Sequence, residues 1–299
     1  MSKTITSKVP SVRLIIFIAS ILLLAALYSW FRLVYSRPAV VFDRMLNSML
    51  ATPGVSKQIS QTEGTQKVNQ NVQLTTMPQQ RVHSASVLHQ GEDGSTVITT
   101  ESIGTIPADY VRYTDIKTSQ KTTEGKAFNF SSVLGIWGRA AANDPNSGGA
   151  QLFNQMVLGV IPVGNVSGLQ RKQLINQIEQ EQVYQVDYSS LKREVVAGRP
   201  QYTYDVTIRP VAYVNMLKTF AHDIGIKELE SVDPAQYKDT PPLRFTMDID
   251  VWSGQLKKIT YKDSDRSETY GSYGARLQIS PPQTTLTVQE LQSRLQQIQ

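Results

Sequence analysis

An unbroken apolar stretch lies near the start of the chain, at residues 14–31, which read LIIFIASILLLAALYSWF. As a helix, its eighteen uncharged residues would rise about 27 Å, close to the roughly 30 Å hydrocarbon core of a bilayer. A cleaved signal peptide is the main alternative. The stretch is long for the apolar part of a signal peptide, however, and ends in bulky residues instead of small ones. The pattern predicts an uncleaved transmembrane signal anchor over residues 14–33, after a basic cytoplasmic tail at 1–13.

Basic residues without acidic partners flank the predicted anchor on both sides. Three of them and the α-amine precede it, and two follow it: Lys3, Lys8, Arg13, Arg32 and Arg37. Because cytoplasmic flanks carry the excess of Lys and Arg, the tally favours a cytoplasmic N-terminus. We therefore expect a single-pass protein of the cell membrane whose remaining chain, residues 54–299, forms an extracytoplasmic domain.

The period of the apolar positions changes twice after the anchor. Val41, Met45 and Met49 recur at helical spacing, which predicts a linker helix of about fourteen residues within residues 34–53. From there to about residue 121, apolar and polar residues alternate with a period of two, the pattern of half-buried strands. Turn residues cut this region into about five strands, and their short links favour antiparallel pairing.

Helical and strand patterns follow one another in blocks over the second half. Two predicted helices, one of them beginning at Pro210, carry apolar side chains that are candidates for the lining of a ligand pocket: Met156, Val160, Met216 and Phe220. The same side chains would pack an ordinary core equally well. Together these blocks predict an α+β fold with a largely antiparallel sheet rather than alternating β/α units.

The clearest hairpin in the chain joins residues 245–251 to residues 255–262 through Ser253-Gly254. The neighbouring Trp252 ends the alternating strand, and we expect it to lie in the core. A last strand is expected over about residues 270–279. A C-terminal helix should follow, with a capping box formed by Thr287 and Glu290.

Composition narrows the function classes. The chain is 40% hydrophobic and carries a formal charge of +5, but the five basic residues of the first 37 leave 25 basic and 25 acidic residues in the rest. A neutral body offers no basic patch for phosphates, so no nucleic-acid partner is expected. The absence of cysteine excludes disulfides, thiol nucleophiles and lipidated cysteines.

A search for catalytic and metal-binding motifs returns only weak candidates. His83 and His89 could share one face of a strand, but the sequence nominates no further metal ligands. Ser189 and Lys192 form an S-x-x-K match without its companion motifs. An acidic group around the hairpin is more simply a solvated strand face neutralised by nearby lysines: Asp248, Asp250, Asp263 and Asp265. We predict no metal, no cofactor and no enzymatic activity.

Two phrases of the sequence resemble the repeated strand phrases of the LolA-like and LprG-like envelope proteins. One is LRFTMDIDVWSGQLKKITY at residues 243–261, and the other is GRPQYTYDV at residues 198–206. The resemblance implies that an amphipathic helix enters a strongly curved antiparallel sheet, half-barrel-like, whose hollow is covered by helices. It also implies a carrier of lipid or lipoprotein. No pocket residue of those families has a matching motif here.

The resulting expectation is a membrane-tethered, extracytoplasmic binding or scaffold protein of a bacterial cell envelope that holds a lipid or another amphiphile. Its partners would be the bilayer, through the N-terminal helix, and a lipid or an envelope protein. An envelope hydrolase whose site is not recognisable from the sequence is the alternative.

Overall fold

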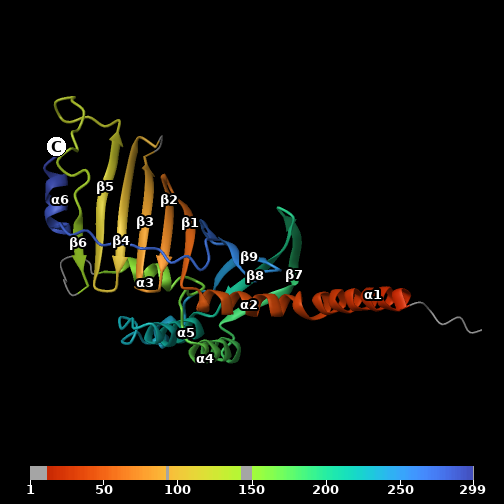
Figure 1. Ribbon diagram of the computed structural model, residues 1–299. Helices are drawn as coiled ribbons and strands as arrows, with labels where there is room; N and C mark the ends of the chain where they lie inside the picture. The colour runs from red at the N-terminus through yellow and green to blue at the C-terminus, as the bar shows by residue number, and fades with distance from the viewer. Residues whose placement is uncertain (1–11, 92–93, 143–149, 299) are drawn as a thin grey trace, which may run out of the picture.

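The computed structural model describes residues 12–91, 94–142 and 150–298, without the side chains of residues 12–19 and 32. Twelve described strands form one open sheet (Figure 1), in the order β12-β6-β5-β4-β3-β2-β1-β11-β10-β9-β8-β7. All neighbouring strands are antiparallel except β12 and β6, which are parallel. The strands are β1 Gly54–Glu63, β2 Gln66–Thr75, β3 Arg81–Gln90, β4 Thr96–Thr105, β5 Ala108–Thr118, β6 Gly138–Ala141, β7 Tyr184–Val196, β8 Arg199–Ile208, β9 Leu243–Asp250, β10 Leu256–Tyr261, β11 Asp265–Gly271 and β12 Leu286–Thr287.

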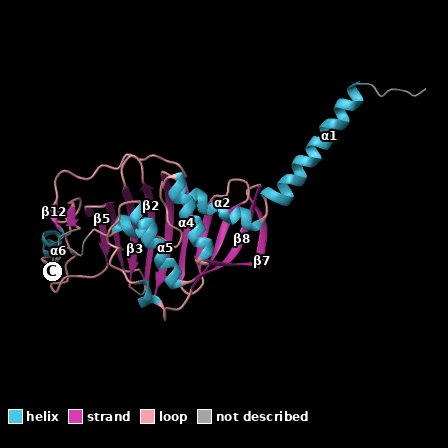
Figure 2. Ribbon diagram, turned by 90° about the horizontal axis from the view of Figure 1, so that it is seen from below, coloured by secondary structure: helices cyan, strands magenta, loops and turns pink. Residues whose placement is uncertain are grey.

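Helices are inserted between the runs of strands, so the fold class is α+β, as predicted. Seen from below (Figure 2), α2, α4 and α5 lie together over one face of the sheet. The helices are α1 Val12–Trp30, α2 Pro38–Ala51, α3 Leu152–Val157, α4 Gly168–Gln180, α5 Pro210–Asp223 and α6 Val288–Gln296, with a π-helical turn η1 at Phe31–Tyr35 and a 3-10 turn η2 at Pro234–Tyr237.

Helix α1 projects away from the body of the molecule (Figure 1). Its large apolar side chains from Ile21 onward are exposed, and Leu22 and Leu24 are among the most exposed of them. Among the residues that the structure describes, no helix has the length and hydropathy that a membrane crossing requires. The predicted anchor at residues 14–33 includes residues 14–19, whose backbone is described but whose side chains are not.

The core lies between the sheet and α2, α4 and α5. The helix that we expected to act as a linker belongs to this core, because one of its faces is fully buried: Val41, Phe42, Met45, Leu46, Met49 and Leu50. It packs beneath Tyr202 and Tyr204 of β8, whose hydroxyls donate to the carbonyl oxygens of Ser36 and Pro38. Phe42 meets Tyr204 edge-on, at 5.8 Å between ring centroids. Helix α2 is thereby fixed to β8 in the second half of the chain.

Several predicted elements are confirmed. The fourteen-residue helix is α2, the five consecutive strands are β1 to β5, the helix beginning at Pro210 is α5, and the hairpin is β9–β10. Thr287 and Glu290 form the expected capping box of α6. These elements carry their own apolar period or cap, so their local sequence is sufficient to specify them.

Other predictions are wrong. The last long strand is β11 at Asp265–Gly271 instead of residues 270–279, because Glu268 is among its buried positions and no alternation of apolar residues marks the strand. Trp252 is 47% exposed, since it lies one step out of phase with the buried residues before it. Asp250 is buried instead of solvated, because Arg199 pairs with it. The predicted lysine partners also differ: Asp263 pairs with Arg244, and Lys262 pairs with Asp205.

Candidate functional site

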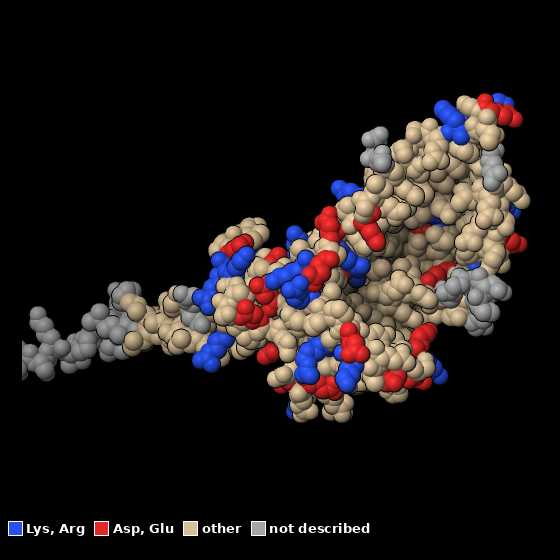
Figure 3. Space-filling view, turned by 180° about the vertical axis from the view of Figure 1, so that it is seen from behind, with Lys and Arg blue, Asp and Glu red and all other residues tan. Residues whose placement is uncertain are grey.

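A cavity of about 790 Å³ lies between the sheet and the helices that cover it. Its floor comes from β1, β2, β10 and β11, and its roof from α3, α5 and the segment that follows α5. Seen from behind (Figure 3), a hollow with mainly uncharged walls opens between the long strands and the helices. Cavities of this size suit small organic ligands.

Helix α3 is held in place by two residues of the sheet. One carboxylate oxygen of Asp109 on β5 accepts the backbone N–H groups of Gln151 and Leu152, at 2.7 and 2.8 Å. Gly104 on β4 lies directly beneath, where an added Cβ would come within 2.8 Å of the backbone nitrogen of Phe153. The short helix therefore lies flat on the sheet, and its remaining side chains form part of the cavity roof.

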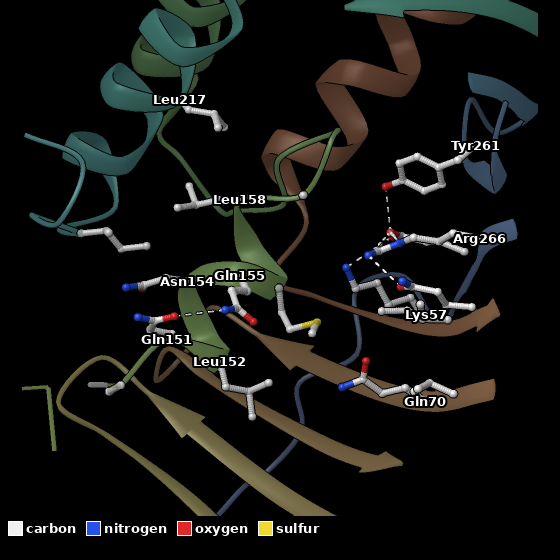
Figure 4. A pocket seen from close by; sticks show the side chains of 18 of the residues that line it. Lys57, Gln70, Gln151, Leu152, Asn154, Gln155, Leu158, Leu217, Tyr261 and Arg266 are labelled. Atoms are coloured by element: carbon white, nitrogen blue, oxygen red, sulfur yellow. Dashed lines mark hydrogen bonds and ion pairs between the residues drawn. The ribbon is translucent and has the colours of Figure 1, made fainter. Parts of the chain in front are cut away.

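One wall of the cavity is apolar. The side chains of Leu152, Leu158 and Leu217 form one side in the close view (Figure 4). They belong to α3, the turn after it and α5, so segments far apart in the sequence build this wall. The apolar residues of the whole lining are Ile59 and Val68 on the strands and Ala150, Leu152, Met156, Leu158, Leu217, Ile226 and Leu229 on the helical side, which also contributes Gln151, Asn154 and Gln155.

The opposite wall carries a buried ionic cluster centred on Glu268 of β11. Lys57 Nζ on β1 lies 3.4 Å from Glu268 Oε2, and Arg266 donates to Oε1 from two nitrogens, at 2.7 and 3.2 Å. The hydroxyls of Tyr261 and Tyr270 also donate to this carboxylate, at 3.0 and 2.7 Å. Only 4% of the Lys57 side chain and 2% of the Glu268 side chain are exposed.

The surroundings of these two groups shift their pKa values in the same direction. Burial would raise the pKa of Glu268, but the charges of Lys57 and Arg266 outweigh it and lower the pKa to about 2. Burial lowers the pKa of Lys57, and the neighbouring Glu268 opposes that shift only in part. Glu268 is therefore ionised at neutral pH, and the cluster holds two basic side chains around one carboxylate.

Two polar groups of the cavity lining have unused hydrogen-bonding capacity. The lysine ammonium has three donors, and within the described part of the chain Lys57 Nζ donates to Glu268. Asn154 Oδ1 is buried without a hydrogen-bond partner among the described residues. Such groups are costly unless something polar reaches them. The two lie on opposite sides of the cavity (Figure 4), so Lys57 marks where the polar end of a ligand would lie and Asn154 is a separate polar group on α3.

The inner face of the sheet continues beyond the cavity as a row of half-buried apolar side chains. Val68, Leu88, Ile98 and Ile116 are register partners across β2, β3, β4 and β5. The row leads from the cavity, which Val68 lines, to a second groove of about 270 Å³ that Ile98 and Ile116 line. Phe128, Phe130 and two residues of the C-terminal region, Leu295 and Ile298, close that groove.

The four residues predicted to line a pocket have different positions. Met156 on α3 lines the cavity. Met216 and Phe220 on α5 are fully buried in the core, and Val160 is buried beyond the end of α3. None of these three lies among the residues that line the cavity, although Leu217, next to Met216, does. The apolar period of α5 identified the helix but not which of its side chains face the opening.

No pattern in the sequence predicted the ionic cluster. Lys57 and Glu268 are 211 positions apart, and each looks like a solvent-facing residue in its own strand. The only local signal is that Glu268 stands between Arg266 and Tyr270, at the period of two that one face of a strand requires. A charged residue in that position normally indicates solvent.

The other candidate sites lack the geometry of a reaction centre. His83 Nε2 lies 2.8 Å from Glu101 on the neighbouring strand, and Arg112 pairs with the same carboxylate. The hydroxyl of Ser189 donates to Asp187 at 2.6 Å. Among the described residues, no group of three His, Cys, Asp or Glu side chains could hold a metal ion.

Comparison with protein-family models finds no match to this chain, and comparison with curated proteins finds no similar sequence. The cavity and the surface of the molecule are therefore the features from which a function can be inferred.

Proposed function

We propose that this protein is a membrane-attached binding protein of a bacterial cell envelope that holds an amphiphile in the cavity and does not transform it. The observation that carries the proposal is the pairing of an apolar wall with a buried ionic wall in one cavity of about 790 Å³. A purely apolar ligand would leave the ionic wall without polar contacts, and a purely polar one would leave the apolar wall in contact with water.

The polar end of the ligand is expected to be anionic or rich in hydrogen-bond acceptors. Within the buried cluster, Lys57 and Arg266 outnumber the single carboxylate of Glu268, and Lys57 has donors to spare. The two other carboxylates of the lining, Glu63 and Glu228, are exposed. The apolar chain would then lie under Leu152, Leu158 and Leu217 and continue over the row that begins at Val68. A fatty acid or a lipid with an anionic head group fits this division.

Membrane attachment forms part of the same proposal. The exposed leucines of α1 and the uncharged sequence of residues 14–31 support contact between this helix and lipid. We further propose that the sheet acts as a half-barrel, with α2, α3 and α5 as its cover. In that arrangement the cavity would be held close to a membrane that could supply its ligand.

The proposal is tested by extracting and identifying, by mass spectrometry, the small molecules that copurify with the full-length protein in detergent. Leu158→Arg places a charge in the apolar wall and should abolish copurification of the amphiphile. Leu169→Arg is the matched control, because Leu169 is exposed on α4 away from the cavity lining. Circular dichroism would verify that both variants are folded.

Equal amounts of the same lipid in wild type, Leu158→Arg and Leu169→Arg would show detergent-like adherence and contradict the proposal. Recovery of a modified product in place of the bound molecule would contradict the non-catalytic part of it.

A further inference from the structure

The edge strand β7 and the turn between β9 and β10 expose large apolar side chains, of which Tyr188 also packs edge-on against Tyr204 of the core. Val195 is 73% exposed, and Val196, Tyr188 and Trp252 are each close to half exposed. We name these four residues the edge patch. Strand β7 ends the strand order of the sheet, so its outer edge is unpaired within the described chain. An exposed edge with apolar side chains invites contact with another surface.

Hydrogen bonds fix the edge patch to the base of α1. The hydroxyl of Tyr35, at the end of η1, donates to the backbone carbonyl of Trp252 at 2.8 Å. Arg44 of α2 donates to the carbonyls of Tyr35 and Val251, and its guanidinium stacks 3.6 Å from the centre of the Tyr35 ring. The turn and the base of the helix therefore form one connected unit.

The β7–β8 hairpin is tied to the same unit. Val251 donates its backbone N–H to Pro200, and Arg199 pairs with Asp250 and lies 5.5 Å from the centre of the Trp252 ring. Figure 1 shows β7 on the side of the body from which α1 departs. Lipid that surrounds α1 would therefore meet this side of the sheet first.

The chemistry of the edge patch matches the interface of a bilayer. Tyrosine and tryptophan side chains prefer the head-group level, where an apolar ring and a polar group are both satisfied. Lys192 and Arg193 are exposed on the same strand as Val195, with one acidic residue, Glu194, between them and Val195, and basic residues at this level are attracted to anionic head groups. Apolar, aromatic and basic side chains thus occur together beside an exposed apolar helix.

We propose that the edge patch rests on the lipid surface and sets the orientation of the body relative to the membrane. This inference rests on the membrane attachment proposed above for α1. Its occupant is the head-group region of a bilayer. A second copy of the chain paired along β7 is an alternative outcome of the test.

The three tryptophans of the chain, Trp30, Trp137 and Trp252, provide the experiment. Three full-length variants each keep one tryptophan and replace the other two by phenylalanine, and all are reconstituted into phosphatidylcholine and phosphatidylglycerol vesicles. Quenching is measured with lipids brominated near the head group, and with aqueous iodide. Trp30, at the end of α1, reports attachment, while Trp137 precedes β6 near the opposite end of the strand order.

Loss of most of the Trp30 and Trp252 fluorescence in brominated vesicles, with Trp137 unaffected, is the expected result. Quenching of Trp30 alone would overturn the edge patch as a lipid contact and leave attachment intact. Absence of quenching at both Trp30 and Trp252 would overturn attachment as well. Protection of Trp252 from both quenchers would indicate a second copy, and equal quenching of Trp137 would contradict the orientation.

Discussion

The two ends of the sheet carry different amounts of cover. In the part formed by β8 to β10, the inward side chains lie under α2, α4 and α5 and are almost completely buried, as Tyr204, Phe245 and Met247 illustrate. In the part formed by β2 to β5, α3 covers one end of the inner face, and Phe128, Phe130, Leu295 and Ile298 cover the groove at Ile98 and Ile116. Among the described residues, most inward side chains between these two covers are half-buried. The strands are of similar or greater length in this less covered part.

This difference indicates that one part of the sheet mainly stabilises the fold and the other is available for a ligand. Burial stabilises in proportion to the apolar area removed from water, so the covered part contributes most of the packing free energy. The less covered part keeps an apolar row accessible at the cost of that stabilisation. A surface of this kind is useful when a ligand covers it, and the cavity lies where the two parts meet, at the pairing of β1 with β11.

Truncation in the covered part should have the largest effect on stability. Phe220 on α5 is fully buried, and its ring lies within 3 Å of the position that a Cβ on Gly164 would occupy. Phe220→Ala should therefore lower the free energy of unfolding by about 3–5 kcal/mol. Denaturant unfolding of the full-length protein in detergent measures this. A cost below about 1 kcal/mol would show that the site is loosely packed.

The ionic cluster at the seam between the two parts should make stability depend on acid pH. The pKa of Glu268 is about 2 in the folded protein, against about 4.3 in an unfolded chain. A lowered pKa stabilises the folded state above the unfolded value, and this contribution is lost as pH falls from about 4.3 to 2. Its size is about 3 kcal/mol.

Glu268→Gln should lose this contribution at neutral pH and flatten the unfolding free energy between pH 4.3 and 2. Glu290→Gln, at the exposed cap of α6, is a suitable comparison because it removes a carboxylate outside the cluster. An unchanged pH profile in Glu268→Gln would show that the cluster does not couple the two parts.

How far the sequence predicts this molecule depends on whether the signal is local. Alternation of apolar and polar residues with a period of two is sufficient to predict β1 to β5. The helical spacing of Val41, Met45 and Met49 is sufficient to predict α2. Strand β7 escaped prediction because most of its residues are exposed, so no apolar alternation marks it. An edge strand is specified by the neighbour to which it pairs, which a single window does not contain.

The candidate site depends on long-range contacts, and for this reason only its helical roof could be anticipated. Met156 was identified from its helix, but Glu268 is buried only because Lys57 and Arg266 neutralise it. Trp252 shows the converse error. Phase alone places it on the opposite face from Val251, so its place at the end of an alternating strand is not sufficient to bury it.

A truncation in the less covered part should cost much less than one under the helices. Leu88 on β3 is half-buried in the apolar row, so Leu88→Ala should cost about 1 kcal/mol. Met247→Ala on β9 is the control in the covered part, where the side chain is fully buried and the cost should be about 2–5 kcal/mol. Equal costs for the two would remove the distinction between the parts.

The smallest effect is expected at the turn that carries the edge patch. Trp252 is half exposed and its clearest contact is the guanidinium of Arg199, so Trp252→Ala should cost about 0.5–1 kcal/mol in detergent. Asp250 beside it is buried and accepts from the backbone N–H and hydroxyl of Ser253 as well as from Arg199. Asp250→Ala should therefore cost more, about 1–3 kcal/mol, because these donors lose their partner. If thermal unfolding showed Trp252→Ala to be the more damaging change, the indole would be part of the core. It would then not be free to contact lipid.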